Sequence, residues 1–279
     1  MSVKTTRIAH VSDLHLLEPL LQVEHGSRSY GFDVRFVSLG RKLDPRERMR
    51  KATRALNAAR RAGVDHVVVS GDLTETGTPR QFEAVAEVFH GSGIAPSEVT
   101  LVPGNHDAYT SPGAWQKALQ GPLRDYAPTS AHGPGAVVER ASFCILPLDV
   151  ACHQPVTRSS GELSSGEADA LERRLRDPAF SRKAIVVVQH HPPHPHKVPA
   201  WQWIDGLRGW ARMMNLLERH PDVHVLHGHL HYAVNRVVSF GRDRIFGAPA
   251  VVSEKEDTVR VRLYEVRDGV LESAGLIAA

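Results

Sequence analysis

Short apolar runs rich in valine and isoleucine alternate along the chain with segments of helical periodicity. A short apolar run bounded by turn residues is typical of a strand that is buried on both faces of a sheet. Runs of this kind cover residues 7–12, 66–70, 99–102, 184–189 and 223–226. Because helical segments lie between these runs, the pattern predicts an α/β protein.

Two helices with defined ends are predicted in the first third of the chain. The first follows Asp44, a favourable N-cap residue, and ends before Gly63, a residue typical of the position after a helix. Its apolar residues step by three or four, which gives one buried stripe. The second helix begins at Thr78, followed by a proline that suits a first turn. Further helical patterns cover residues 164–175 and 210–220.

The remaining segments are predicted to be antiparallel strands and loops. Residues 136–140 and 143–150 indicate an antiparallel hairpin, and the alternating positions in 233–279 indicate further antiparallel strands. Residues 16–43 show no strong period, and residues 194–210 carry prolines and tryptophans, so we expect loops there. No repeat or linker interrupts the chain. We therefore expect a single domain over residues 1–279, with 16–43 as a loop insertion and 233–279 as C-terminal antiparallel strands.

The composition narrows the class of protein. Of the 279 residues, 42% are hydrophobic, which is enough for a buried core and too many for a disordered chain. The two cysteines are too few for a disulfide framework and favour a reducing compartment. No apolar run is long enough to cross a membrane, and the first residues lead into a strand without a signal-peptide core. We expect a cytoplasmic protein.

Positive charge is concentrated between residues 41 and 61. This segment holds nine basic and two acidic side chains, whereas the whole chain has a net charge of +3. The helix predicted over residues 44–62 is therefore a candidate for contact with anionic lipid head groups, an acidic substrate or nucleic acid. The alternative is a solvated helix face whose arginine stems cover apolar surface. Because no aromatic residues interleave with the charges, we favour this alternative and expect no nucleic-acid partner.

Histidine is the unusual feature of the composition, with 17 residues. It is the commonest metal ligand and a frequent proton carrier. Histidine, aspartate and asparagine follow five predicted strands at the points where the strands end: Asp13 and His15, Asp72, Asn105 and His106, His190, and His229 and His231. Functional groups of α/β proteins gather outside the carboxyl ends of strands, so we expect these side chains to share one crevice. Glycines at 71, 104 and 228 flank them and allow close approach of the backbone.

The donor set indicates a transition-metal site. Carboxylate, amide oxygen and imidazole suit Mn, Fe, Co or Zn, whereas calcium and magnesium prefer shells of oxygen alone. The candidate ligands are Asp13, His15, Asp72, Asn105, His190, His229 and His231. They are too many for one ordinary site, but they suit two metal ions that share a bridging carboxylate. Burying so many polar groups together without a metal would leave them unpaired at high cost.

Taken together, the motifs resemble a known family. They are Asp13-x-His15, Gly71-Asp72, Gly104-Asn105-His106-Asp107, His190-x-Pro192 and Gly228-His229-Leu230-His231. Their order is similar to that of the calcineurin-like metallophosphoesterases, and the resemblance extends over most of the chain. It implies a four-layer αββα sandwich, in which two mixed β-sheets are flanked by helices, with a site for two metal ions at the strand ends.

The resemblance also implies a role for each residue. One metal ion would be held by Asp13, His15 and His231, the other by Asn105, His190 and His229, and Asp72 would bridge them. His106 would face the substrate and protonate the leaving group, and Asp107 would orient the His106 ring.

Other histidines near the motifs have structural interpretations. His10 lies within the first predicted strand and is expected to be a hydrogen-bonded core residue. His191 and His227 adjoin proposed ligands, and because successive strand residues point to opposite faces, we leave them outside the metal set. His194 and His196 lie in a proline-rich loop, where an exposed surface position is the simpler interpretation.

The resemblance implies a phosphoester hydrolase. We expect a phosphodiesterase in which a metal-bridging hydroxide attacks small phosphodiesters such as cyclic nucleotides or glycerophosphodiesters. One alternative is a phosphomonoesterase or a pyrophosphatase that acts on a nucleotide-linked or lipid phosphate. Another is a catalytically silent scaffold, against which the complete ligand set and His106 argue. Aromatic residues in 16–43 and 194–210 are natural walls for a substrate pocket, with plain loop packing as the alternative.

Overall fold

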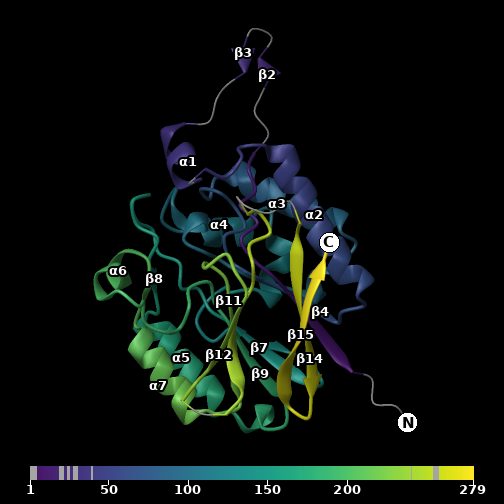
Figure 1. The fold of residues 1–279 in the computed structure, drawn as a ribbon, viewed down its shortest axis with the longest axis vertical. Helices are drawn as coiled ribbons and strands as arrows, with labels where there is room; N and C mark the ends of the chain where they lie inside the picture. The colour runs from purple at the N-terminus through teal and green to yellow at the C-terminus, as the bar shows by residue number, and fades with distance from the viewer. Residues whose placement is uncertain are drawn as a thin grey trace.

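The computed structural model describes residues 5–18, 22–23, 26–27, 31–38, 40–239, 241–253 and 258–279. Two large mixed β-sheets lie face to face, and helices cover their outer sides (Figure 1). The strand order is β15-β14-β1-β4-β5 in the first sheet and β12-β13-β11-β9-β7-β6 in the second. This architecture is the αββα sandwich predicted from the sequence.

The first sheet joins a parallel half to an antiparallel hairpin. Its strands are β1 (Thr6–Val11), β4 (His66–Ser70), β5 (Val99–Val102), β14 (Arg260–Arg267) and β15 (Val270–Ala278). The pairs β1–β4 and β4–β5 are parallel, whereas β14 runs antiparallel to both β1 and β15. Helices α2 (Pro45–Arg61) and α3 (Pro79–Gly91) connect the parallel strands and cover the outer face.

The second sheet has a parallel centre and antiparallel edges. Its strands are β6 (Val138–Glu139), β7 (Phe143–Pro147), β9 (Ala184–Val188), β11 (Val223–His227), β12 (Val234–Val237) and β13 (Asp243–Gly247). The predicted hairpin is present as β6 and β7. Within the tail, β13 departs from the antiparallel expectation, because the short strand β12 carries the chain back so that β13 runs parallel to β11. Helices α5 (Ser165–Leu175) and α7 (Trp210–Arg219) cover the outer face.

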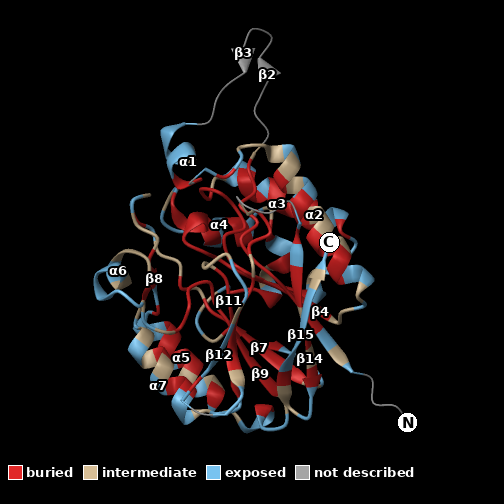
Figure 2. Ribbon diagram, in the orientation of Figure 1, coloured by how far each residue is buried: buried red, intermediate tan, exposed pale blue. Residues whose placement is uncertain are grey.

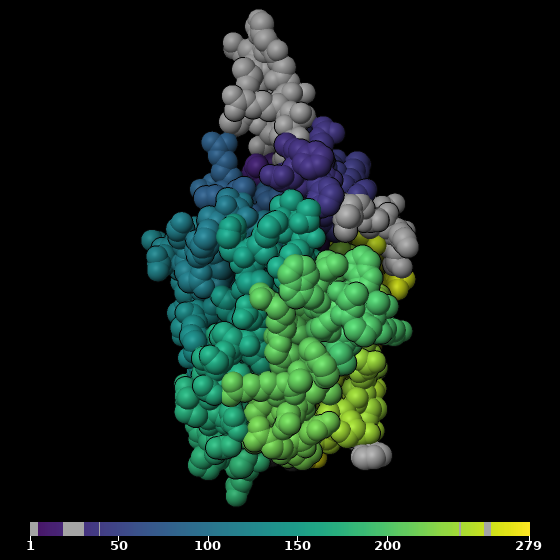
Figure 3. Space-filling view, turned by 90° about the vertical axis from the view of Figure 1, so that its left-hand side faces the viewer, coloured from purple at the N-terminus to yellow at the C-terminus, as the bar shows by residue number. Residues whose placement is uncertain are grey.

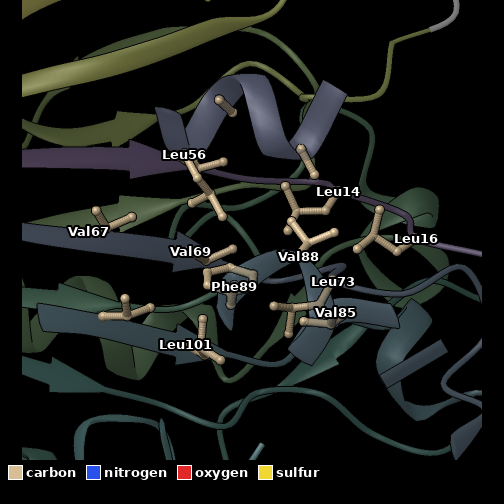
Figure 4. Close-up of a cluster of buried hydrophobic side chains, with 14 of the residues drawn as sticks. Leu14, Leu16, Leu56, Val67, Val69, Leu73, Val85, Val88, Phe89 and Leu101 are labelled. Carbon is tan, nitrogen blue, oxygen red and sulfur yellow. The ribbon is translucent and has the colours of Figure 1, made fainter. Parts of the chain in front are cut away.

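Both faces of the central strands are buried (Figure 2). In β4, Val67 and Val69 pack against α2 and α3, as Figure 4 shows, whereas Val68 packs between the two sheets. In β9 the neighbouring residues divide in the same way between the helical layer and the other sheet. This double burial explains the continuous apolar runs in the sequence, and each such side chain contributes about 1.5–3 kcal/mol on leaving water.

The helix ends agree with the sequence signals. The Asp44 side chain accepts a hydrogen bond from the Glu47 N–H at 3.1 Å, and the Thr78 hydroxyl accepts one from the Gln81 N–H at 3.2 Å. Gly63 follows α2 with a φ of +64°, the left-handed conformation that glycine adopts at lowest cost. The predicted N-caps and helix end are confirmed.

A short helix lies within each segment expected to be a loop. Helix α1 (Phe32–Val37) falls within 16–43, where Phe32 and Phe36 stack one helical turn apart, and α6 (Pro199–Ile204) begins with a proline within 194–210. The glycines of the first segment and the prolines of the second indicate loops, and a helix of six residues is too short to produce a clear helical period. Residues 19–21, 24–25, 28–30 and 39 of the first segment lie outside the described part of the chain.

The smaller elements complete the connections. They are β2 (Gln22–Val23), β3 (Gly26–Ser27), β8 (Gly161–Glu162), β10 (Leu207–Arg208), α4 (Ala114–Gln120) and the 3₁₀ turns Pro96–Glu98, His106–Ala108, Arg124–Thr129 and Pro178–Phe180. Strands β8 and β10 pair in parallel and join the α6 region to the segment after β7. Among the described residues, no helix has the length and apolar character needed to span a bilayer.

Candidate metal centre

The predicted residues meet where the parallel strands of both sheets end. Strands β1, β4 and β5 of the first sheet lead into Asp13 and His15, Asp72, and Asn105 and His106. Strands β9 and β11 of the second sheet lead into His190, and into His229 and His231. The site is therefore built at the junction of the two sheets, from segments that are far apart in the sequence.

The Asp72 carboxylate lies among three imidazoles. Its Oδ2 atom is 3.2 Å from His190 Nε2, 3.8 Å from His15 Nε2 and 3.9 Å from His106 Nε2. Asp13 Oδ1 lies 3.2 Å from His231 Nε2 and 3.9 Å from His15 Nε2. The Nε2 atom of His15 thus lies within 4 Å of both carboxylates.

Among the described residues, three groups present ligand atoms close enough together to hold a metal ion. In each group, the ligand atoms lie within 4.8 Å of one another: Asp13, His15 and His231 form the first group, Asp13, Asp72 and His190 the second, and His15, Glu75 and His106 the third. The ring of His229 packs at 5.2 Å from that of His190, between centroids. Asn105 donates from Nδ2 to the Tyr109 hydroxyl at 2.8 Å, which leaves its Oδ1 as the atom suited to a metal.

Several buried polar atoms have no hydrogen-bond partner within the described residues. Those in the site are both carboxylate oxygens of Asp13, both ring nitrogens of His15, Oδ1 of Asn105 and Nε2 of His190; others lie elsewhere in the molecule. Buried polar atoms of native proteins are nearly always paired. Because six such atoms from four predicted ligands gather in one site, the donor set fits bound metal ions.

Electrostatics in the site favour bound positive charge. Burial raises the pKa of a carboxyl group, yet the neighbouring His190 and His106 hold the pKa of Asp72 well below its usual value. Burial lowers the pKa of an imidazole, yet the Asp72 carboxylate raises the pKa of His190 to about 9. The chain therefore stabilises a cation beside Asp72, and a metal ion supplies such a charge.

Five of the predicted ligands have a backbone conformation that is uncommon for residues other than glycine. The φ angles are +57° at Asp13, +45° at His15, +51° at Asp72, +68° at His229 and +61° at His231. Left-handed residues of this kind cost about 1–2 kcal/mol each and are concentrated at functional sites. The fold therefore maintains strain at the residues that carry the chemistry.

Backbone hydrogen bonds hold these strained segments together. Asp13 N–H donates to the Gly71 carbonyl at 3.1 Å, and His15 N–H donates to the Asp72 carbonyl at 2.9 Å. Across the two strand ends of the second sheet, Gly228 N–H donates to the His190 carbonyl at 3.0 Å. The ligand positions are thus set by main-chain pairing and not by side-chain packing alone.

Two glycines allow the backbone to approach the site closely. A Cβ atom on Gly104 would lie 2.1 Å from Asp72 Oδ1, and one on Gly228 would lie 2.0 Å from the Ser12 hydroxyl oxygen and 2.9 Å from Asp13 Oδ2. Any other residue at these positions would displace the carboxylate or the strand end.

His106 and Asp107 differ in what they contact. His106 Nδ1 donates to the Glu75 carbonyl at 2.7 Å, so its Nε2 atom faces the site. Asp107 instead accepts hydrogen bonds from Leu73 N–H, Thr74 N–H, the Thr74 hydroxyl and Gly104 N–H. The expectation that Asp107 orients the His106 ring is therefore corrected: its carboxylate turns back onto the loop that follows β4, and a carbonyl orients the ring.

Two carboxylates beside the ligands are absent from the sequence prediction. Glu75 is fully buried, with Oε2 3.5 Å from His15 Nδ1, and it also pairs with Arg48 of the basic helix. Asp205 Oδ1 lies 3.0 Å from His229 Nε2. Glu75 lies in the loop after β4, three residues beyond Asp72, and no pattern in the sequence marks either Glu75 or Asp205.

The other histidines have structural partners. His10 is buried, with Nε2 2.7 Å from the Ser70 hydroxyl and Nδ1 3.2 Å from the Tyr264 hydroxyl, which confirms the predicted core role. His191 Nε2 donates to the Ser159 carbonyl at 2.7 Å, and His227 Nδ1 donates to the Gly228 carbonyl at 2.9 Å.

Comparison with known proteins identifies the family. The family model of the calcineurin-like phosphoesterases matches residues 6–233, a span that includes every predicted ligand. The chain therefore belongs to the calcineurin-like phosphoesterase family.

Relatives and solved structures agree with this assignment. The chain is 24% identical over 257 residues to a probable cyclic nucleotide phosphodiesterase of Synechococcus, covering 90% of this chain and 82% of that protein. It is 26% identical over 228 residues to the glycerophosphodiester phosphodiesterase GpdQ of Enterobacter lignolyticus, covering 80% and 70%.

Among solved structures, a dimetal phosphatase of Danio rerio shares the fold. Its TM-score is 0.64 at 14% identity, with 97% of this chain and 98% of that chain covered. The TT1561 protein of Thermus thermophilus aligns with a TM-score of 0.57 at 11% identity, covering 98% and 99%.

Proposed function

We propose that this protein is a phosphodiesterase that uses two metal ions to hydrolyse small phosphodiesters. The observation that carries the proposal is the position of Asp72, whose carboxylate lies among imidazoles from both sheets while Asp13 and His231 meet beside it. Support for a diester substrate comes from the two relatives described above, each named as a phosphodiesterase.

We keep the distribution of ligands that the family resemblance implies: Asp13, His15 and His231 would hold one metal ion, and Asn105, His190 and His229 the other, with Asp72 between them. The close approach of Asp13, His15 and His231 supports the first site, and the contact of Asp72 with His190 supports the bridging position. A hydrogen bond of the His190 ring indicates which of its two nitrogens would bind a metal ion. His190 Nδ1 is engaged by the Ser70 carbonyl at 2.7 Å, so Nε2 is its ligand atom. The metals that suit this set are Mn, Fe, Co and Zn.

A metal pair of this kind, when bound, activates water and offsets negative charge on the phosphoryl oxygens. His106 has a separate task in the proposal. Because the Glu75 carbonyl occupies Nδ1, a second proton on this ring is held at Nε2, on the side of Asp72 where the substrate would bind. Burial lowers the pKa of His106, which makes its cation a stronger acid toward a leaving alkoxide.

The walls of the substrate site would come from the segments around α1 and α6. Figure 3 shows the side of the molecule that carries α6, where the green surface of residues near 200 adjoins the teal surface of residues near 150, below the purple of α1. Ser159 N–H donates to the Ile204 carbonyl at 2.9 Å, and Asp205 contacts His229. The exposed indoles of Trp201 and Trp203 are therefore carried by a helix whose end is attached to the site.

A metal-reconstitution assay tests the proposed function. Protein stripped by a chelator is loaded with Mn, Fe, Co or Zn and assayed with bis(4-nitrophenyl) phosphate and 4-nitrophenyl phosphate, followed by cyclic nucleotides and glycerophosphodiesters. We expect metal-dependent turnover with a higher kcat/KM for the diester. A preference for the monoester overturns the diester assignment, and binding of two metal equivalents without turnover of either ester overturns the proposal of an enzyme.

A further inference from the structure

Two carboxylates outside the family motifs lie beside histidines that are predicted to bind metal. In each case the carboxylate faces the outer nitrogen, which is the ring nitrogen not proposed as the metal ligand. Glu75 Oε2 lies 3.5 Å from His15 Nδ1, and Asp205 Oδ1 lies 3.0 Å from His229 Nε2. We propose that Glu75 and Asp205 are positioning residues that orient these two rings and set the affinities of the two metal sites separately. The inference rests on the proposed ligand set, and it concerns metal binding and not turnover.

Glu75 is held in place by buried cations. Its Oε1 atom accepts from Arg41 Nη2 at 3.0 Å and from the Ser38 hydroxyl at 2.8 Å, and Oε2 accepts from Arg48 Nη1. All three charged side chains are almost completely buried. Two buried guanidinium ions pair with this carboxylate, and a buried cation needs such a negative partner.

The same network controls both the ring and the backbone of His15. Arg48 Nη1 donates to the His15 carbonyl at 2.7 Å, at a residue whose φ is +45°. The His15 ring then lies between Glu75 on its Nδ1 side and Asp72 and Asp13 on its Nε2 side. Glu75 therefore acts through His15, because both of its own oxygens are occupied by guanidinium or hydroxyl donors.

Asp205 stands in the corresponding position for the other site, with the ring reversed. It follows the last residue of α6, and both its Oδ1 and its main-chain carbonyl lie 3.0 Å from His229 Nε2. The Ser159 hydroxyl donates to the same Oδ1 atom and fixes the carboxylate. Because Asp205 faces Nε2 of His229, the Nδ1 atom of that ring is the one left for a metal ion. In His15 the order is the opposite: Glu75 faces Nδ1, and Nε2 is left for the metal ion.

The contrast with His190 indicates that the carboxylates are a specific feature. The outer nitrogen of His190 faces a neutral carbonyl, that of Ser70, at 2.7 Å. A carboxylate on the outer nitrogen fixes the tautomer and makes the imidazole a stronger donor, and its removal typically lowers metal affinity 10–100-fold. One ligand of each proposed site has a carboxylate on this side, at hydrogen-bond distance for His229 (3.0 Å) and at ion-pair distance for His15 (3.5 Å), so each carboxylate acts mainly on one metal ion.

Metal binding by single-site backgrounds tests the inference. His231→Ala leaves the site of Asn105, His190 and His229, and His190→Ala leaves the site of Asp13, His15 and His231. Into each background we would introduce Glu75→Gln or Asp205→Asn and measure Co²⁺ affinity by calorimetry, with the visible Co²⁺ spectrum as a readout of ligand geometry. We expect Glu75→Gln to weaken binding about 10–100-fold only in His190→Ala, and Asp205→Asn by a similar factor only in His231→Ala.

Controls separate this role from a general loss of structure. Glu167→Gln removes a buried carboxylate in α5 and should leave both affinities unchanged. Glu75→Asp keeps the charge and should retain more affinity than Glu75→Gln. If Glu75→Gln does not fold because Arg41 and Arg48 lose their partner, Asp205→Asn still decides the matter, since Asp205 is partly exposed.

Two results would overturn the inference: unchanged Co²⁺ affinities in both variants, or equal losses at both sites. Failure of the proposed function is a different observation, in which two metal ions bind with the expected dependence on Glu75 and Asp205 but neither ester is hydrolysed.

Discussion

Asp72 Oδ2 and His190 Nε2 lie 3.2 Å apart, although Asp72 follows a strand of the first sheet and His190 a strand of the second. This contact joins the ends of the two sheets at the centre of the proposed metal site. Because the contact joins residues of both sheets, the geometry of the site depends on how the two sheets pack against each other. Val68 of the first sheet and Val186 of the second belong to the buried cluster between them.

Replacement of Asp72 should be more damaging than replacement of any ligand that serves one metal ion. Asp72→Asn removes the charge that lies between both proposed sites, so both metal ions should bind weakly, and kcat/KM should fall by about a thousandfold or more. His231→Ala should lose one metal ion only. Elemental analysis after gel filtration measures the stoichiometry, and two equivalents retained by Asp72→Asn would contradict the bridging role.

Substitution of His106 should depend on the leaving group. The ring presents Nε2 to the site and is held by the Glu75 carbonyl, so His106→Ala should keep both metal ions. For an alkoxide leaving group, kcat should fall about 10²–10⁴-fold, whereas an activated aryl leaving group, which needs no proton, should be affected far less. Equal losses for both substrates would exclude the role of general acid.

Asp107 should prove to be a structural residue. Its buried carboxylate accepts hydrogen bonds from the loop after β4, so Asp107→Ala should lower the free energy of unfolding by about 3 kcal/mol. Denaturant unfolding of the metal-free protein measures this loss. The ratio of activities toward alkyl and aryl diesters should stay at the wild-type value, and a change in that ratio like that of His106→Ala would restore the catalytic role first expected for Asp107.

Glu167 should make stability depend on pH. Burial raises its pKa to about 7, and burial also raises the pKa of the neighbouring Asp149 to about 6. The folded state then binds more protons than the unfolded state between about pH 4 and 7, so stability falls as pH rises through that window and levels off above it.

The variant Glu167→Gln removes the part of this dependence that comes from Glu167 and leaves the part that comes from Asp149. At pH 8 it should be more stable than the wild type by about 2 kcal/mol, and at pH 4 the two proteins should have similar stability. Chemical denaturation at the two pH values measures both differences. A variant that is equally destabilised at pH 4 and pH 8 would show that packing, not charge, governs this position.

Local signals account for much of what the sequence predicted. The double-sided burial of strands such as β4 and β9 produces unbroken apolar runs, and capping residues such as Asp44 and Thr78 mark helix starts. These features depend on neighbours a few positions away, so they can be recognised without a fold. The short helices α1 and α6 were missed because their few residues produce no sustained period.

The seven metal-ligating candidates were also accessible from the sequence, because a polar residue at a strand end is a local feature and the order of the motifs adds to it. Their roles as ligands stay a prediction until metal binding is measured. The structure adds that ligand atoms of Asp13, His15, Asp72, His190 and His231 lie close together. It also adds that five of the seven candidates have left-handed backbone conformations, which the sequence does not reveal.

By itself, the sequence determined the element order, the family motifs and the kinds of donor available for a metal. Only the tertiary structure decided which carboxylate oxygen contacts which imidazole nitrogen. Asp107 follows His106 directly but turns away from its ring, whereas Glu75 and Asp205, from distant segments, face His15 and His229. Side-chain hydrogen bonds extend over only about 3 Å and depend on direction, so they are determined by how the strand ends pack together.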